Sequence, residues 1–309
     1  MRATSYDAFS TDNSTLTTGE LPDPTVGPGN VLVEVKAAGV NPVDWKIMTG
    51  DLTGLLDAVF PVVPGWDVAG VVRAVGPDTP EFSEGDEVYA YARKEVVRGG
   101  TFAELVAVPA ESLALKPKSL DFTEAGAVPL AGLTALKALQ RTDISPDGSG
   151  RTVLIHGGSG GVGSFGVQIA VAAGAWVIAT ASEPNHEYLR ELGAEPVTYG
   201  DGLADRVREL APGGVDAVTD FVGGVVDTTL AVLAPGGKHV SIADPTVVEH
   251  GGEWLWVRPN AAGLTELAEL ADAGRLTVEI AGTYPLDQVG AAFDASRSSR
   301  TRGKLVIIP

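Results

Sequence analysis

Short apolar runs separated by glycine and proline fill the chain up to about residue 120. Runs of this kind, rich in valine and bounded by turn residues, are typical of β-strands. Their close spacing predicts a compact, barrel-like β region. The runs expected to form strands are VLVEVKAAGV (31–40), DVAGVVRAVG (67–76), DEVYAYA (86–92) and AELVAVP (103–109).

The pattern becomes helical near residue 122, and a helix is expected over TEAGAVPLAGLTALKAL (123–139). Asp121 or Thr123 is the candidate N-cap of this helix. From Arg151 onward, apolar strand patterns alternate with helical ones, the rhythm of a doubly wound α/β sheet. Strands are expected over 152–156, 175–181, 195–199, 216–222, 238–243 and 254–257, and helices over 162–174, 183–193 and 203–210. A helix over 261–274 and strands over 277–282 and 304–308 are expected to rejoin the N-terminal β region.

A glycine-rich turn, HGGSGGVG (156–163), lies between a buried strand pattern and a helical one. Gly158, Gly160 and Gly163 fit the G-x-G-x-x-G spacing of dinucleotide-binding turns. Glycine lets the backbone turn tightly, lets a pyrophosphate approach the amides, and brings the helix close to the sheet. The plain alternative is a structural glycine turn, but the flanking strand and helix favour a nucleotide site.

The residues at the end of the strand expected over 175–181 indicate whether NAD or NADP is bound. An NAD enzyme usually places an acidic residue there to hold the ribose 2′-hydroxyl. This strand ends with Thr180 and Ser182, both uncharged, which leaves room for a 2′-phosphate and favours NADPH, with NADH as the alternative. Glu183 is within range by counting, but it is expected to begin the next helix, where the helix dipole favours a carboxylate.

The charge, the cysteine count and the apolar stretches of the chain exclude several classes of protein. The 309 residues carry 22 Lys plus Arg against 40 Asp plus Glu, a net charge of −18, which argues against a nucleic-acid partner. The chain has no cysteine and four scattered histidines, so no metal site is expected. The start, MRATSYDAFS, has no apolar signal core, and no stretch has the length and apolarity of a membrane span. A cytoplasmic enzyme without a membrane partner is expected.

Several motifs together resemble a known family. They are AGVNPVDWKIMTG (38–50), PVVPGWDVAGVVRAVG (61–76), GGTFAELVAVPA (99–110), AVPLAGLTAL (127–136), the glycine turn, VIATASEPNHEYLRELGAE (177–195) and RGKLVI (302–307). With them the chain resembles the zinc-independent, zeta-crystallin-like quinone oxidoreductases of the medium-chain dehydrogenase/reductase superfamily. The resemblance implies a GroES-like β-barrel catalytic domain (1–122 and 259–309) and a doubly wound Rossmann nucleotide-binding domain (123–258).

The resemblance also implies that this chain lacks the zinc of its metal-dependent relatives. Those relatives carry a metal-binding Cys near the position of Asn41 and a His near that of Trp66. They also carry a four-cysteine structural lobe that this chain does not have.

Cofactor contacts carry over from the family position by position. The turn from Gly157 through Gly158, Ser159, Gly160 and Gly161 to Val162 matches the pyrophosphate site. Asn41 and Thr134 match residues near the nicotinamide and its ribose, and Val222 and Gly223 match the nicotinamide-side loop. Ser182 and Tyr199 match groups that line the adenosine 2′-phosphate, where many relatives add a cation and this chain has Glu183. Arg302 and Lys304 form a cationic cluster with Arg297 and Arg300, either a solvated basic turn or a contact to a cofactor phosphate.

Hydride transfer to a conjugated acceptor needs a donor aimed at the oxygen that becomes negative. Lys46 is the candidate for this donor, held by Asp44 or Asp67, and Asn41 could anchor the carboxamide or the substrate oxygen. The alternative for Lys46 is a surface lysine paired with Asp44. Trp45 is a stacking wall or a core aromatic, and the weaker pocket candidates are Tyr6, Met48, Trp254 and Trp256.

Three functions remain open at this point. The first is an NADPH-dependent, zinc-independent quinone oxidoreductase, and the second is an enone, alkenal or enoyl reductase of a biosynthetic pathway. The third, different in kind, is a non-catalytic nucleotide-binding structural or sensor protein. Trp254 and Trp256 suggest an apolar edge strand, and relatives pair through the edge of this sheet, so a homodimer is expected.

Overall fold

The structure is a computed structural model that describes residues 1–145, 150–298 and 301–309. It divides into two compact units. Unit 1 comprises Met1–Leu133, Arg258–Gly274 and Val278–Pro309, and unit 2 comprises Thr134–Val257 and Arg275–Thr277. No helix in the described part of the chain is long and apolar enough to cross a membrane.

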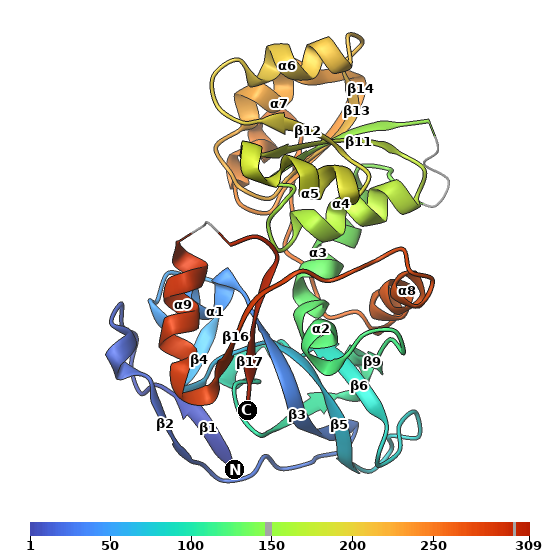
Figure 1. Ribbon diagram of the computed structural model, residues 1–309. Coiled ribbons are helices and arrows are strands. Elements are labelled where there is room, and N and C mark those ends of the chain that lie inside the picture. The colour runs from blue at the N-terminus through green and yellow to red at the C-terminus, as the bar shows by residue number, and fades with distance from the viewer. Residues whose placement is uncertain (146–149, 299–300) are drawn as a thin grey trace. The chain divides into compact units, whose positions relative to one another are not determined.

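Unit 1 is built on a seven-stranded sheet, and it contains both chain termini (Figure 1). Its strands are β1 (Arg2–Ser5), β2 (Thr17–Glu20), β3 (Asn30–Val40), β4 (Asp57–Val63), β5 (Asp67–Val75), β6 (Glu87–Tyr91), β7 (Val96–Gly99), β8 (Leu105–Pro109), β9 (Leu113–Leu115), β16 (Ile280–Pro285) and β17 (Lys304–Ile308). The main sheet runs β16-β17-β3-β5-β6-β9, β8 also pairs with β3, and β1-β2 and β4-β7 form separate pairs.

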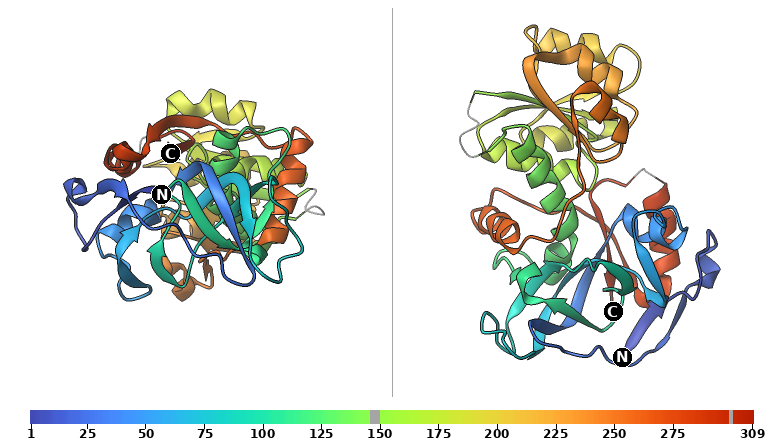
Figure 2. Two further views of the ribbon diagram at one scale, coloured as in Figure 1. Left: turned by 90° about the horizontal axis from the view of Figure 1, so that it is seen from below. Right: turned by 180° about the vertical axis from the view of Figure 1, so that it is seen from behind.

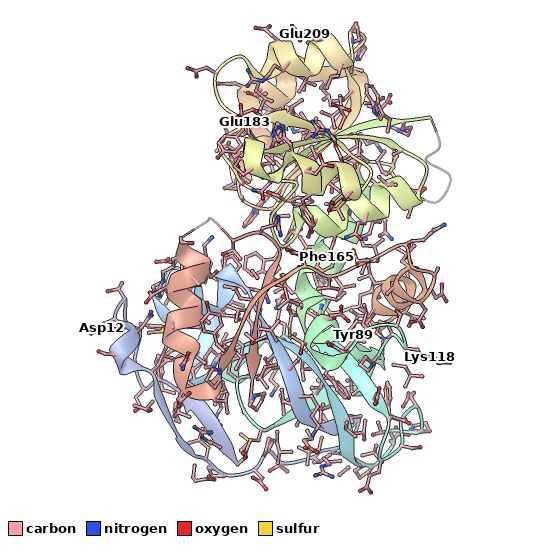
Figure 3. All side chains as sticks on the ribbon, in the orientation of Figure 1. Asp12, Tyr89, Lys118, Phe165, Glu183 and Glu209 are labelled. Carbon is pink, nitrogen blue, oxygen red and sulfur yellow. The ribbon has the colours of Figure 1, made fainter. Side chains whose placement is uncertain are left out.

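The helices of unit 1 are α1 (Pro42–Met48), α2 (Phe122–Ala127), α8 (Ala261–Asp272) and α9 (Val289–Arg297), and α9 lies beside α1 (Figure 1). Short 3-10 turns occupy Asn13–Thr15, Ala110–Ser112 and Leu286–Gln288. Tyr89 shows how the core satisfies its polar atoms, because its fully buried hydroxyl donates to the carbonyl of Leu264 (Figure 3).

Unit 2 is a six-stranded parallel sheet in the order β12-β11-β10-β13-β14-β15. Its strands are β10 (Thr152–His156), β11 (Trp176–Ala181), β12 (Glu195–Thr198), β13 (Val215–Asp220), β14 (Leu233–Ser241) and β15 (Glu253–Trp254). Helices α4 (Gly163–Ala172) and α5 (His186–Glu191) cover one face, and α6 (Leu203–Leu210) and α7 (Val226–Val232) cover the other (Figures 1 and 2). Further 3-10 turns are η3 (Glu183–Asn185) and η4 (Pro245–His250). This strand order is the doubly wound dinucleotide-binding arrangement, as the alternating pattern predicts.

The single helix expected over 123–139 is wrong in one respect. The structure has two helices there, α2 and α3 (Pro129–Arg141), because Pro129 lacks the N–H that would continue α2 and instead begins α3. Asp121 is the N-cap of α2, and its carboxylate accepts the Glu124 N–H at 2.8 Å. The strand expected over 277–282 lies at 280–285, and the strand expected over 254–257 is only the two-residue β15.

Candidate functional site

The glycine turn between β10 and α4 has the geometry that a pyrophosphate cradle requires. Gly157 has a φ of +77°, and a Cβ on it would lie 2.6 Å from the Val222 side chain. A Cβ on Gly163 would lie 2.1 Å from the carbonyl oxygen of Gly157. A side chain is therefore excluded at Gly157 by the Val222 side chain and by the positive φ, and at Gly163 by the backbone of the turn itself.

The N-terminus of α4 is the anion-binding end of this cradle. Val162 stands at its N-cap, and the side chain of this cap residue makes no hydrogen bond to the first turn. The first amides of a helix have no partner within the helix, and together with the helix dipole they favour a negative group at this point. The residues of this turn thus fit the pyrophosphate of a dinucleotide.

Thr180, expected to leave room near the ribose, instead holds the glycine turn. Its Oγ1 accepts the Gly157 N–H at 2.9 Å, and its carbonyl accepts the Gly158 N–H at 2.9 Å. These bonds tie the turn to β11. Thr134, matched to the nicotinamide end, is buried in α3 with 4% of its surface exposed.

Asp220 is a residue that the sequence reasoning missed. It ends β13, and its carboxylate accepts the N–H groups of Val222 at 2.9 Å and Gly223 at 2.9 Å, and the Ser241 hydroxyl at 2.7 Å. The loop matched to the nicotinamide is thus fixed by one buried carboxylate. Burial lowers the pKa of neighbouring His156 to about 4, although the charge of Asp220 opposes the shift, so the imidazole is neutral at pH 7.

Polar side chains gather where β11 and β12 end. Ser182 accepts a hydrogen bond from the Asn185 amide at 3.1 Å, and Tyr199 is 61% exposed. Glu183 is exposed at the start of η3 (Figure 3). Arg206, from α6, donates to the Thr198 carbonyl at 2.7 Å, which places a guanidinium next to Tyr199 that the sequence reasoning did not anticipate.

A second set of polar residues lies inside unit 1. Asn41, Asp44, Asp67 and Lys304 are each 5% exposed or less. The Asn41 side-chain amide donates to Asp67 at 2.8 Å, and its oxygen accepts from the Lys304 ammonium. The Asn41 backbone N–H donates to Asp44 at 2.7 Å, as an acidic residue in the first turn of α1 allows. We call these four residues the buried polar cluster.

Neighbouring backbone completes the buried polar cluster. Lys304 also donates to the Val40 carbonyl at 3.0 Å, and Asp67 accepts the Leu130 N–H at 2.8 Å. Gly39 makes room for Asp67, since a Cβ there would lie 3.0 Å from the carboxylate. Four separate segments of unit 1 therefore meet at this point.

Burial shifts the pKa of every ionisable group in the cluster. It raises the pKa of Asp44 to about 8 and that of Asp67 to about 6, while the charge of Lys304 opposes both shifts. Burial lowers the pKa of Lys304, opposed by the charges of Asp67 and Asp44. Asp44 Oδ1 and the Tyr6 hydroxyl are buried without a hydrogen-bond partner among the described residues, and burial together with the charge of Asp44 raises the pKa of Tyr6. Perturbed groups gathered in this way are characteristic of functional sites.

The expectation that Asp44 or Asp67 holds Lys46 is wrong. Lys46 is exposed in the last turn of α1, and its ammonium lies 5.7 Å from the centre of the Trp45 ring. Residues two apart on a helix point in different directions, so Asp44 turns inward while Lys46 turns outward. The cation beside the two aspartates is Lys304.

The pocket candidates are distributed between core and surface. Tyr6 and Met48 belong to the buried core of unit 1. Trp45 is half-buried and donates from Nε1 to the Ser296 hydroxyl at 3.2 Å. Trp254 is 40% exposed at the edge strand β15 of unit 2, with its ring 6.4 Å from that of Trp256.

Among the described residues, the side chains of the cationic cluster expected over 297–304 meet different partners. Arg297 donates to Asn13 at 2.9 Å, and Arg302 forms an ion pair with Glu279 at 2.6 Å. Lys304 is buried, so its expected role as a surface phosphate contact is wrong: β17 is buried from Lys304 to Ile307, so side chains on both of its faces lie in the interior. Arg300 lies outside the described residues.

Comparisons with known proteins agree with this architecture. Residues 27–118 match the alcohol dehydrogenase GroES-like domain, and residues 192–307 match the family of zinc-binding dehydrogenases. The chain is 36% identical to an NADPH-dependent alkenal/one oxidoreductase of Arabidopsis thaliana, over 93% of this chain and 74% of that protein. It is 34% identical to a 2-methylene-furan-3-one reductase of Solanum lycopersicum, over 100% of this chain and 79% of that protein. The solved quinone oxidoreductase of Coxiella burnetii superimposes with a TM-score of 0.87 at 31% identity, covering 100% of this chain and 99% of that one.

The chain belongs to the medium-chain dehydrogenase/reductase superfamily, in its zeta-crystallin-like quinone oxidoreductase branch. The expected GroES-like and Rossmann folds are thereby confirmed, and the protein is an enzyme of this superfamily.

The residues of this superfamily member do not fit a zinc ion. The chain has no cysteine, and the Asn41 amide oxygen accepts from Lys304, a cation that repels a metal. Trp66, at the other implied position, has no metal-donor atom. In the described ranges, no three His, Asp or Glu side chains are grouped as metal ligands.

Proposed function

We propose that this protein reduces a quinone or another α,β-unsaturated carbonyl compound with NADPH, without zinc. The observation that carries the proposal is the tight glycine turn at the start of α4, where Gly157 and Gly163 leave no room for a Cβ and the N-cap side chain makes no bond, which fits a dinucleotide pyrophosphate. The names of the relatives, alkenal/one oxidoreductase and quinone oxidoreductase, favour acceptors with a conjugated carbonyl group.

When bound, NADPH supplies the hydride. The chain's own residues then have two tasks, to orient the acceptor and to stabilise the negative charge that develops on its oxygen. A single well-placed donor contributes on the order of 3 kcal/mol to such a step. Lys46 and the Asn41 amide are the proposed donors, and Trp45 is the proposed stacking surface for a flat acceptor.

A preference for NADPH over NADH is part of the proposal. The end of β11 carries no carboxylate, and Ser182 and Tyr199 offer hydroxyl groups. Arg206 brings a cation to the end of β12, and the exposed Glu183 sits in η3 rather than on the strand. This arrangement favours a 2′-phosphate over a 2′-hydroxyl.

The absence of a zinc requirement is likewise a proposal. It is supported by the donor chemistry of the buried polar cluster, in which Lys304 supplies a positive charge beside Asn41 and Asp67. A homodimer formed through β15 is also proposed, because this strand is the edge of its sheet and Trp254 is exposed there.

Oxidation of NADPH and NADH against quinones, 2-alkenals and enoyl thioesters tests the proposed function. We expect turnover with quinones or alkenals, tighter binding of NADPH than of NADH, and no loss of activity after dialysis against a chelator. A preference for enoyl thioesters would identify a biosynthetic enoyl reductase instead. Cofactor binding without turnover on any acceptor would favour the non-catalytic nucleotide-binding protein.

Replacing Lys46 with alanine is expected to lower kcat about 10-fold or more while leaving the dissociation constant of NADPH nearly unchanged. The physical reason is the loss of a positive charge near the developing oxyanion. Steady-state kinetics and a fluorescence titration with NADPH measure the two quantities. Lys118→Ala removes another exposed lysine of unit 1 and is the matched control. Equal kcat values for the two variants would make Lys46 an ordinary surface lysine.

A further inference from the structure

The side chain of Lys304 is buried inside unit 1, an unusual place for a lysine. This residue begins β17, is 5% exposed, and among the described residues has no carboxylate within ion-pair distance. Its partners are the Val40 carbonyl at 3.0 Å and the Asn41 side-chain oxygen. Burying an ammonium group is costly, so a lysine kept in such a place usually does something that an apolar residue cannot.

The arrangement fixes which way the Asn41 amide points. Asp67 can accept hydrogen bonds and Lys304 can donate them, so the amide must turn its nitrogen to Asp67 and its oxygen to Lys304. In the opposite orientation the Asn41 nitrogen would face the Lys304 ammonium, so that two donors meet. The Asn41 oxygen would then face the Asp67 carboxylate, so that two acceptors meet. The two charges together therefore select one of two amide orientations that have nearly the same shape.

This orientation leaves Asn41 with a spare donor. One N–H of its amide goes to Asp67 at 2.8 Å, and the other has only the Gly39 carbonyl at 3.5 Å, the outer limit of a hydrogen bond. A flipped amide would offer a carbonyl oxygen in its place, which cannot bind another carbonyl oxygen.

We propose that Lys304 is a positioning residue, which acts through Asp67 and Asn41 to hold a side-chain N–H ready for a carbonyl oxygen of the acceptor or of the nicotinamide carboxamide. The proposal rests on the proposed function, in which Asn41 contacts one of these two groups. Lys304 itself does not contact either group.

The ionisable groups around the buried polar cluster come from several elements. Asp67, at the start of β5, and Asp44, on α1, act on Lys304, and Tyr91, at the end of β6 where Arg93 follows, interacts with the two aspartates. The positive charge of Lys304 opposes the rise in the pKa of Asp67. Without it, Asp67 should take up a proton at higher pH and could then donate to the Asn41 oxygen, which would permit the flipped amide.

Three variants test the proposal. Lys304→Met removes the charge at similar size, Lys304→Arg keeps a cationic donor, and Lys116→Met removes a lysine of unit 1 that also has a poorly exposed side chain and bonds backbone carbonyls. Far-UV circular dichroism checks folding. Lys304→Gln, which keeps a neutral donor, replaces the methionine variant if that variant does not fold.

The first measurement needs no cofactor and follows the Asn41 side-chain amide by NMR in protein labelled with 15N-asparagine, assigned with Asn41→Ala. We expect two distinct amide proton signals in the wild type, in Lys304→Arg and in Lys116→Met, and exchange-broadened or shifted signals in Lys304→Met. Unchanged Asn41 signals in Lys304→Met would overturn the proposal.

The second measurement is the pH profile of turnover. For Lys304→Met we expect kcat to fall about 10-fold at pH 7 and its acid limb to move to higher pH, with Lys304→Arg restoring most of the activity. A weaker NADPH dissociation constant would indicate the carboxamide as the partner of Asn41, and an unchanged constant with a lower kcat would indicate the acceptor. A Lys304→Met profile identical to that of Lys116→Met would contradict the proposal. A wild type without turnover would contradict the proposed function, and the amide signals alone would then decide the role of Lys304.

Discussion

Gly163→Ala is expected to weaken NADPH binding by about 100-fold or more, equivalent to about 2.7 kcal/mol. The new Cβ would lie 2.1 Å from the carbonyl oxygen of Gly157 and 2.8 Å from the Cα of Gly158. Both are backbone atoms, which cannot rotate aside as a side chain can. The N-terminus of α4 must therefore move, and the amides that fit a pyrophosphate lose their alignment.

A fluorescence titration with NADPH measures this loss, and a urea unfolding curve shows whether unit 2 still folds. Gly213→Ala is the matched control, because a Cβ there meets no atom within 4 Å. Gly157→Ala supplies an independent check, since Gly157 has a φ of +77° and a Cβ there would meet Val222 at 2.6 Å. If Gly163→Ala bound NADPH as tightly as Gly213→Ala, the glycine turn would not be the cofactor cradle.

Asp67→Ala is expected to lower the free energy of unfolding by about 3–5 kcal/mol, the usual result of leaving a buried charge uncompensated. Asp67 is fully buried and accepts hydrogen bonds from the Asn41 amide and the Leu130 N–H. Without it, Lys304 keeps its charge in the interior with its main counter-charge gone. Urea unfolding followed by circular dichroism measures the change.

Two further variants separate this effect from the general cost of removing a charged side chain. Arg73→Ala removes the exposed partner of Glu34 and should cost no more than about 1 kcal/mol. Asp67→Ala combined with Lys304→Met should be less destabilised than the sum of the two single variants, because the second change removes the unpaired charge. Strict additivity would show that the two charges do not interact.

Much of unit 2 could be predicted from local patterns. The glycine turn and the alternation of strands and helices each depend on residues near one another in the chain, as does the cap at Asp121 in unit 1. The shortest strands of unit 1, such as β7 and β9, were missed because three or four residues carry too little pattern. Helix α1 was missed as an element for the same reason, although the Asn41-Pro42 start and Asp44 were a signal for its N-terminus.

The partners of the candidate catalytic residues could not be predicted in this way. Asp44 or Asp67 is expected to hold Lys46, yet Asp44 and Lys46 point apart on α1. Lys304 is 263 residues from Asn41 along the chain, and only the pairing of Leu305 with Val40 brings the two side chains together. Likewise, only the fold shows that Asp220 holds the loop of Val222 and Gly223.

The sequence by itself determined the superfamily, the dinucleotide turn and the lack of thiolate ligands for zinc, since each depends on residue types and short spacings. The tertiary structure alone decided which charges are buried and which are solvated. Lys304, expected at the surface, lies inside with Asp67, while Lys46, expected beside the aspartates, lies outside. The physical reason is that burial and pairing depend on strands brought together from distant parts of the chain, and these set both the pKa of a group and the partner that it meets.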